Sequence, residues 1–189
     1  VAPALGATFA EEYGSMFEVV IQLGAILAVA VIYFQKLNPF SRQKDTFEKK
    51  ETWKLWGKVV IASIPAALVG VVGDKILEKL SGKDIDGWIF NWKTVAAALI
   101  IYGILFIVIE KFHKNQASVE RVEDISIGQA MAIGCFQVLS IIPGTSRSGS
   151  TILGGMLGGV SRTASAEFSF FMGIPAMVGA SLLKGYGFF

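Results

Sequence analysis

The chain has 189 residues, of which 53% are hydrophobic and only 17% charged, and its formal net charge is +2. Soluble domains carry about 25% charged residues, so this composition indicates a membrane protein, and the small net charge argues against nucleic acid as a partner. The single cysteine, Cys135, excludes a disulfide framework within the chain.

Four apolar segments are long enough to cross a bilayer as helices, which requires about 20 residues each. They cover about residues 16–34, 55–73, 92–109 and 166–183, and Pro65 is expected to bend the second. We therefore expect residues 1–189 to form a single integral membrane domain of the all-α class, a polytopic membrane helix bundle.

The charged residues fall between these spans and predict an orientation. Residues 35–58 contain seven Lys and Arg and residues 110–126 contain three, whereas residues 74–94 contain four. If the first and third connections lie on one side, the positive-inside rule places residues 35–54 and 110–126 in the cytoplasm.

The part from about 127 to 159 does not fit two full spans. Residues 127–142 are apolar but short and end at Pro143, a helix terminator. Residues 149–159 are shorter still and rich in glycine. Two short arms joined by a polar turn predict a re-entrant helical hairpin, whose tip has to be buried in protein or line a wet cavity.

A weak internal repeat accompanies this pattern. A shift of 151 residues aligns 17–30 with 168–181, apolar positions on apolar positions, although any two membrane spans look alike. Inverted repeats with broken helices are a common membrane architecture. If the repeat is real, the counterpart of the hairpin part 127–151 is expected before Val1.

The tip of the hairpin concentrates groups that bind anions. A charged arginine at membrane depth costs free energy, so Arg147 needs a partner or a water-filled cavity. Its planar guanidinium presents a fork of hydrogen-bond donors that suits phosphate. The neighbouring hydroxyls can donate to phosphoryl oxygens, and the start of the next helix favours an anion. Two glycines permit tight turning. These tip residues are Gly144, Ser146, Ser148, Gly149, Ser150 and Thr151.

The alternative for this segment is an ordinary capped helix start, with Arg147 reaching to an interface. An arginine among hydroxyls, between two helices too short to span, favours anion binding. Further polar candidates are Glu18, either functional or interfacial, and Gln137, which either bonds across helices or faces the site. Arg162 is expected to pair with Glu167.

The stretch "PGTSRSGST" (143–151) resembles the Pro-Gly-x-Ser-Arg-Ser-x-x-Thr motif of the bacterial undecaprenyl-diphosphate phosphatases, the bacitracin-resistance family. The segments "FEVVIQLGAILAV", "IGCFQ", "GGMLGGVSR" and "AEFSFFMGIPAM" resemble the family in the same order, so the resemblance covers essentially the whole chain.

The resemblance implies an enzyme of the bacterial inner (plasma) membrane, alone or as a homo-oligomer, with inverted repeats and an active site facing the outer side. It would hydrolyse undecaprenyl diphosphate to the monophosphate used for peptidoglycan, with Mg²⁺ or Ca²⁺ as cofactor, and confer bacitracin resistance. The prenyl tail would lie along residues 154–159. The implied catalytic residues are Arg147, Ser146, Ser148 and Thr151; the implied substrate-binding residues are Gly144, Gly149, Ser150 and Gln137, with Glu18 in support.

One family motif is missing from the chain. It is a Glu/Gln-x-x-x-Glu pair followed by a Ser/Thr-rich turn and a histidine, in the first re-entrant hairpin. We expect it, with the metal ligands and the nucleophile or base, to lie before Val1, and a further span after Phe189. The chain alone is then expected to be inactive. The alternative function is a non-enzymatic inverted-repeat transporter of an anionic substrate or phospholipid.

Overall fold

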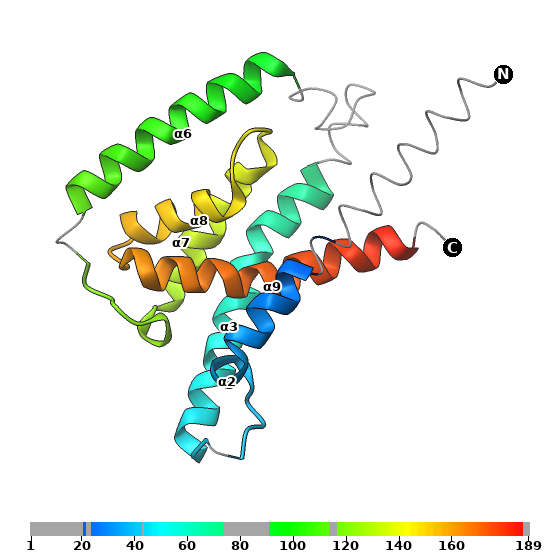
Figure 1. The fold of residues 1–189 in the computed structure, drawn as a ribbon, viewed down its shortest axis with the longest axis vertical. Helices are drawn as coiled ribbons and strands as arrows, with labels where there is room; N and C mark the ends of the chain where they lie inside the picture. The colour runs from blue at the N-terminus through cyan, green and yellow to red at the C-terminus, as the bar shows by residue number, and fades with distance from the viewer. Residues whose placement is uncertain (1–20, 22–23, 43, 74–90, 114–116, 187–189) are drawn as a thin grey trace.

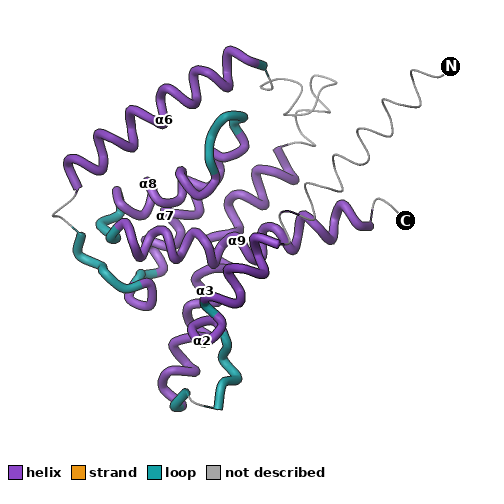
Figure 2. Tube along the Cα trace, viewed as in Figure 1, coloured by secondary structure: helices purple, strands orange, loops and turns teal. Residues whose placement is uncertain are grey.

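The computed structural model describes residues 21, 24–42, 44–73, 91–113 and 117–186 of the chain (Figure 1). Within these ranges the regular elements are helices, as Figure 2 shows, apart from one isolated bridge between Val119 and Val160. The predicted all-α class is therefore confirmed for the described part of the chain.

The first predicted span is described only in its second half. Residues 24–32 are helical, a turn follows at Tyr33, and α2 (Phe34–Leu37) completes the segment. Glu18 and the start of the predicted repeat at Phe17 lie outside the described residues.

The second predicted span lies within a longer helix. Helix α3 (Thr46–Leu68) continues into a π-helical turn, η1 (Val69–Gly73). It begins well before residue 55 because Asp45 and Glu48 form a capping box, in which the Asp45 carboxylate accepts from the Thr46 N–H at 2.7 Å and Glu48 accepts from the Asp45 N–H at 3.1 Å. The predicted span was defined by apolar residues alone, so it omitted the polar N-terminal part of α3 before residue 55.

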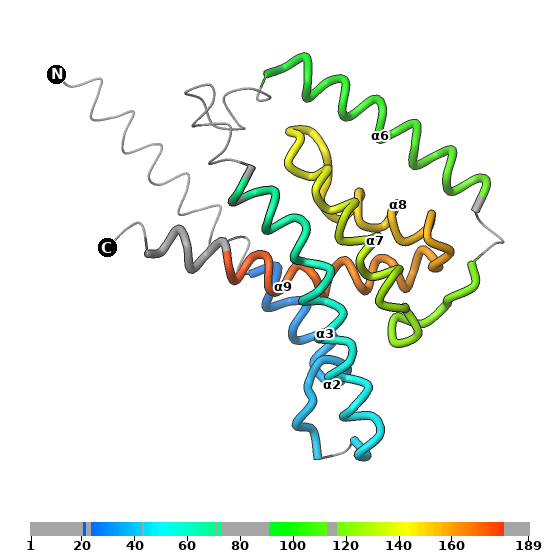
Figure 3. Tube along the Cα trace, turned by 180° about the vertical axis from the view of Figure 1, so that it is seen from behind, coloured from blue at the N-terminus to red at the C-terminus, as the bar shows by residue number. Residues whose placement is uncertain are grey.

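Helix α6 (Trp92–His113) agrees closely with the third predicted span. Among the described helices it is the one that is long and apolar enough to cross a membrane. It lies on the outside of the bundle in both Figure 1 and Figure 3, and its outer side chains, such as Ile100 and Ile107, are 62% and 70% exposed. A water-soluble monomer rarely leaves so continuous an apolar face uncovered.

The predicted pair of short arms is present. A 3₁₀ turn, η2 (Val122–Asp124), leads into α7 (Ile127–Gln137), which a second capping box at Ser126 and Gln129 begins. Another 3₁₀ turn, η3 (Val138–Ile141), and the turn at Pro143 connect it to α8 (Arg147–Leu157). That this pair re-enters a membrane, and that the longer helices span it, stay predictions.

Helix α9 (Arg162–Tyr186) covers the fourth predicted span and contains Pro175. It shares the main core with α3, α7 and the helix at 24–32; the rings of Tyr33 and Phe171 meet edge to face, with centroids 5.1 Å apart. A second core, formed by Ile109, Leu153 and Met156, joins α6 to α8. The hairpin is thus held between α3, α6 and α9.

Candidate functional site

The tip of the hairpin is a tight turn braced by the first turn of α6. Thr145 donates its N–H to the Ile142 carbonyl at 3.1 Å, and Gly144 adopts φ +90°. A Cβ on Gly144 would lie 2.8 Å from the Val95 carbonyl oxygen. Both the dihedral angle and the close contact require glycine here, which agrees with its prediction as a turning residue.

Arg147 is the first residue of α8 and is half-buried. Its guanidinium lies against α9, where a Cβ built on Gly173 would be 2.9 Å from Nη2. Its Nη1 is buried and has no hydrogen-bond partner among the described residues. A guanidinium carries five donors and no acceptor, so this arrangement leaves a buried cationic donor for an anion.

The hydroxyls of Ser146 and Ser148 lie at the tip beside Arg147, 3.2 Å from each other. Ser146 also caps α8, since its Oγ accepts from the Gly149 N–H at 3.2 Å. The ordinary capping interpretation of this serine is therefore correct, but an accepting hydroxyl keeps its own proton to donate. The cap on α8 therefore does not use up the Ser146 hydroxyl proton.

Two other predicted hydroxyls point elsewhere. Ser150 is buried and donates to the Ser146 carbonyl at 3.1 Å. Thr151 is 1% exposed, and its Oγ1 lies 2.6 Å from Oγ of Ser169 on α9. Both hydroxyls are engaged in packing α8 in this structure.

Gln137 and Gly149 both lie inside the protein. Gln137, at the end of α7, is 6% exposed, and its Oε1 has no partner among the described residues. Gly149 is buried against the ring of Phe106 on α6, 3.1 Å from the position of a Cβ. Besides Nη1 of Arg147, the hairpin thus contains two buried side-chain oxygens without a partner among the described residues, Oε1 of Gln137 and Oγ1 of Thr145.

Gly154 and Gly155, in the segment 154–159 where the prenyl tail was expected to lie, are buried between helices. A Cβ on Gly154 would lie 2.7 Å from the Phe136 ring, and one on Gly155 would lie 2.3 Å from Oγ of Ser165. These glycines bring α8 close to α7 and α9, and the space that they leave is already filled.

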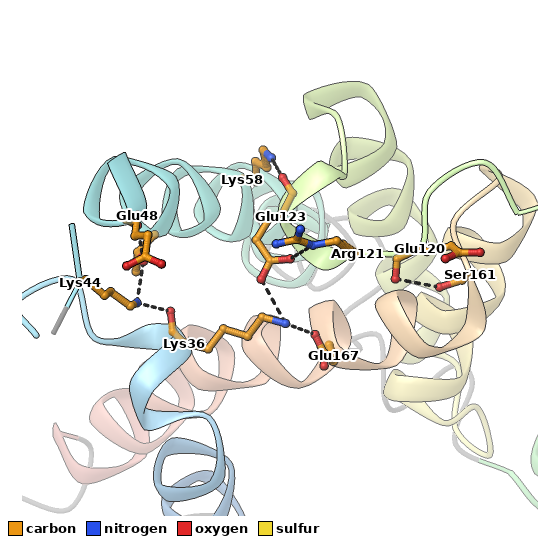
Figure 4. A network of polar contacts seen from close by, with 10 residues as sticks. Lys36, Lys44, Glu48, Lys58, Glu120, Arg121, Glu123, Ser161 and Glu167 are labelled. Carbon is orange, nitrogen blue, oxygen red and sulfur yellow. Dashed lines mark hydrogen bonds and ion pairs between the residues drawn. The ribbon is translucent and has the colours of Figure 1, made fainter. Parts of the chain in front are cut away.

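A second polar cluster lies at the other end of the hairpin (Figure 4). Lys36 follows the first helix, and its Nζ is 3.1 Å from Glu123 and 2.7 Å from Glu167. The expected pairing of Arg162 with Glu167 is therefore wrong, and Arg162 instead pairs with Glu110. Because Lys36 and Glu123 belong to the first and third connections, their contact places these two connections at the same end of the helix bundle. The side of a membrane on which that end lies stays a prediction.

The electrostatics of this cluster reflect pairing. Burial lowers the pKa of Lys36, but hydrogen bonds and charges from Glu167 and Glu123 outweigh it and raise the pKa above 10.5. For Glu123 the effect of burial has the opposite sign and raises the pKa. The backbone hydrogen bond of Glu123 and the nearby Lys36 outweigh burial and hold this pKa below 4.5. A cleft of about 470 Å³ adjoins these side chains. Its lining contains four carboxylates (Glu48, Glu51, Glu123 and Asp124) beside three cations, and Lys36 is already paired, so the cleft is a weaker anion site than the tip.

Sequence reasoning missed two residues of α9 that contact α8: Gly173, which lies against Arg147, and Ser169, which lies against Thr151. Their signal is a small residue at every fourth position, which begins at Ser165. Such a row marks one helix face that lets a second helix approach closely.

Comparison with known proteins supports the resemblance noted in the sequence. A family model described as "Bacitracin resistance protein BacA" matches residues 2–188. The chain is 51% identical over 179 residues to the undecaprenyl-diphosphatase of Enterococcus faecalis, covering 94% of this chain and 62% of that protein. It is 53% identical over 178 residues to the undecaprenyl-diphosphatase of Latilactobacillus sakei subsp. sakei, covering 92% and 61%. The chain therefore spans a little over three fifths of the length of these relatives.

Proposed function

This chain belongs to the bacitracin resistance protein BacA family, and from that premise we propose that it carries part of the active site of an undecaprenyl-diphosphate phosphatase. The reaction is hydrolysis of undecaprenyl diphosphate to undecaprenyl phosphate and inorganic phosphate, which returns the lipid carrier to peptidoglycan synthesis and confers resistance to bacitracin. The activity is proposed for the whole protein that contains these residues.

The observation that carries the proposal is the environment of Arg147. Its buried Nη1 lacks a partner among the described residues, and Arg147 stands at the start of α8, between Ser146 and Ser148 in the sequence. A buried donor without a partner costs about 1–3 kcal/mol, and more when charged. Phosphate oxygens match the guanidinium fork in geometry and charge, so a diphosphate is a ligand that would offset this cost.

In the proposed mechanism the chain binds and orients the diphosphate. Arg147 donates to phosphoryl oxygens, and Ser146 and Ser148 donate from the same turn, so that the lipid diphosphate is held at a fixed depth. Phosphoryl transfer depends mainly on positioning and on neutralising charge. These residues thus hold the transferred group while water attacks it.

The divalent cation, Mg²⁺ or Ca²⁺, enters the proposal through the family resemblance alone. In the described ranges no group of three or more His, Cys, Asp or Glu side chains could hold a metal ion. The described residues do not fit the ion, and no step of the mechanism is assigned to it.

We further propose a multi-pass protein of the bacterial inner membrane, built from inverted repeats, with the site open to the outer side. Each arm of the hairpin has 11 residues, which is about 16 Å of helix and half of a bilayer core. The contact between Gly144 and Val95 sets the tip beside the start of α6, at the opposite end of α7 from the pair formed by Lys36 and Glu123. The positive-inside rule assigns that charged end to the cytoplasm.

Phosphate release tests the proposal. The whole protein, purified in detergent, should release inorganic phosphate from farnesyl diphosphate when Mg²⁺ or Ca²⁺ is present, and Arg147→Ala should abolish the release. Binding of farnesyl diphosphate without any release would overturn the enzyme and favour the transporter of an anionic lipid.

A further inference from the structure

Helices α8 and α9 pack as an antiparallel pair whose contacts recur every four residues. Near the connecting turn Gly155 meets Ser165, one turn further Thr151 meets Ser169, and one turn further again Arg147 meets Gly173. Residues four apart share one face of a helix. Each step of one turn along α8 is therefore matched by one turn along α9 in the opposite direction.

The first two contacts fix this register. A Cβ on Gly155 would lie only 2.3 Å from Oγ of Ser165, so the helices approach as closely as a glycine allows. The Thr151 and Ser169 hydroxyls, 2.6 Å apart and both buried, form a hydrogen bond between the helices. A shift by one residue in either helix would break this bond.

The third contact, between Gly173 and Arg147, involves the guanidinium that is proposed to bind the anion. Gly173 is buried, and a Cβ there would lie 2.9 Å from Nη2 and 3.6 Å from both Cζ and Nη1 of Arg147. The guanidinium therefore lies over the bare backbone of α9, in space that any side chain at position 173 would share. Nη2 is the nearest atom, and the unpartnered Nη1 is further from this surface.

We propose that Gly173 is a positioning residue for Arg147. The Thr151–Ser169 bond fixes the register of α8 against α9, and so the position along α9 at which the guanidinium lies. The surface of α9 at Gly173 supports one side of the guanidinium, so that Nη1 stays directed to the anion. The identity of the anion as a lipid diphosphate rests on the proposed function, but the support of Arg147 by Gly173 does not.

A role of Gly173 in helix packing alone makes a different prediction. If the glycine served only to bring α9 close to its neighbours, a larger residue would harm the protein whether or not Arg147 is present. If it supports the guanidinium, removal of the Arg147 side chain should open the space that a larger residue needs.

The experiment is a double-mutant cycle of Gly173→Val and Arg147→Ala in the whole protein. Thermal stability and the affinity for farnesyl diphosphate are measured for all four proteins. Gly179→Val is the matched control on the same helix, since a Cβ at Gly179 meets no atom of the described residues within 4 Å.

We expect Gly173→Val to weaken farnesyl diphosphate binding about tenfold, which is the value of one hydrogen bond to a charged group. The same change should lower Tm with Arg147 present and leave Tm nearly unchanged after Arg147→Ala. Gly179→Val should leave the affinity as it was. An equal loss of Tm in both backgrounds, or a folded Gly173→Val protein with unchanged affinity, would overturn the proposal.

Two further outcomes are also decided. If Gly173→Val cannot be purified, Gly173→Ala replaces it in the same cycle, with a smaller effect expected in the same direction. If the wild-type protein does not bind farnesyl diphosphate, the proposed function fails, whereas the Tm cycle still decides whether Gly173 supports Arg147.

Discussion

Replacement of Arg147 by lysine tests whether the site needs a guanidinium or only a positive charge. Lysine keeps the charge but presents a single ammonium group, which cannot donate two parallel hydrogen bonds to one phosphate. In the structure Nη2 lies against the backbone at Gly173, while Nη1 is buried without a partner among the described residues. An ammonium can occupy only one of these two places.

The expected magnitude follows from the lost donor. A hydrogen bond to a charged group contributes about 1.5–3 kcal/mol, so Arg147→Lys should lower kcat/KM for farnesyl diphosphate by roughly 10-fold to 150-fold. The assay is phosphate release by the whole protein under steady-state conditions, with Mg²⁺ or Ca²⁺ supplied.

Arg162→Lys is the matched control, because Arg162 pairs with Glu110 on the surface and both side chains are exposed. Exposed ion pairs contribute about 0–1 kcal/mol, so this variant should keep nearly normal activity. If Arg147→Lys retained kcat/KM within about twofold of wild type, a loss below 0.5 kcal/mol, the fork of donors would not be what the site requires.

Three further predictions concern the scaffold of the site. Gly134→Ala should destabilise the protein by about 1–3 kcal/mol or more, because the new Cβ would lie 2.1 Å from a backbone oxygen of α3. Lys36→Met should lower Tm modestly and weaken the fall of stability in acid, since Glu123 then loses the cation that helps to hold its pKa down. Ser165→Ala should be neutral or stabilising, because its buried Oγ has no partner among the described residues.

The changes at Gly134 and Ser165 each have a direct check. Gly103→Ala, on α6 with no atom of the described residues within 4 Å of the new Cβ, should keep or raise Tm, and an equal loss at Gly134 and Gly103 would refute the packing argument. A loss of Tm in Ser165→Ala comparable to that in Ser169→Ala would show that the Ser165 hydroxyl has a partner that matters.

The pair formed by Lys36 and Glu123 makes the stability of the protein depend on pH in both acid and base. Glu123 has a lowered pKa, so the stability that it contributes is present above pH 4.5 and is lost as the pH falls through the lowered value. Lys36 has a raised pKa, so its contribution is complete below pH 10.5 and is lost as the pH rises through the raised value. Lys36→Met should flatten both limbs of a Tm–pH profile, whereas Lys54→Met, at an exposed pair, should flatten neither.

The sequence was sufficient to predict the hairpin and its tip. Pro143 ended an apolar arm that was too short to span, and the run of hydroxyls and glycines around Arg147 located the next helix start. These are local features, because caps, breakers and segment lengths act within a few residues. The early start of α3 was predictable in the same way, from Asp45 and Glu48, but a search for apolar segments passed over it.

Other features depended on tertiary packing, which a single sequence does not reveal. Thr151 belongs to the motif, yet its hydroxyl contacts Ser169 because of the register between α8 and α9. Glu167 was expected to pair with nearby Arg162, but it pairs with Lys36, 131 residues away in the sequence. In both cases the observed partner is one that only the folded bundle brings into contact.

Lys36 and Arg162 differ from Arg147 in what stabilises their charge, and this difference bears on how the site works. Lys36 and Arg162 are neutralised by carboxylates, while Arg147 has no acidic partner among the described residues and is supported instead by the uncharged surface at Gly173. A carboxylate beside Arg147 would stabilise the free protein, but it would compete with the phosphate for the same donors. Support by backbone and packing holds the guanidinium in place without occupying Nη1, so the cost of burying the charge is offset chiefly when an anion binds.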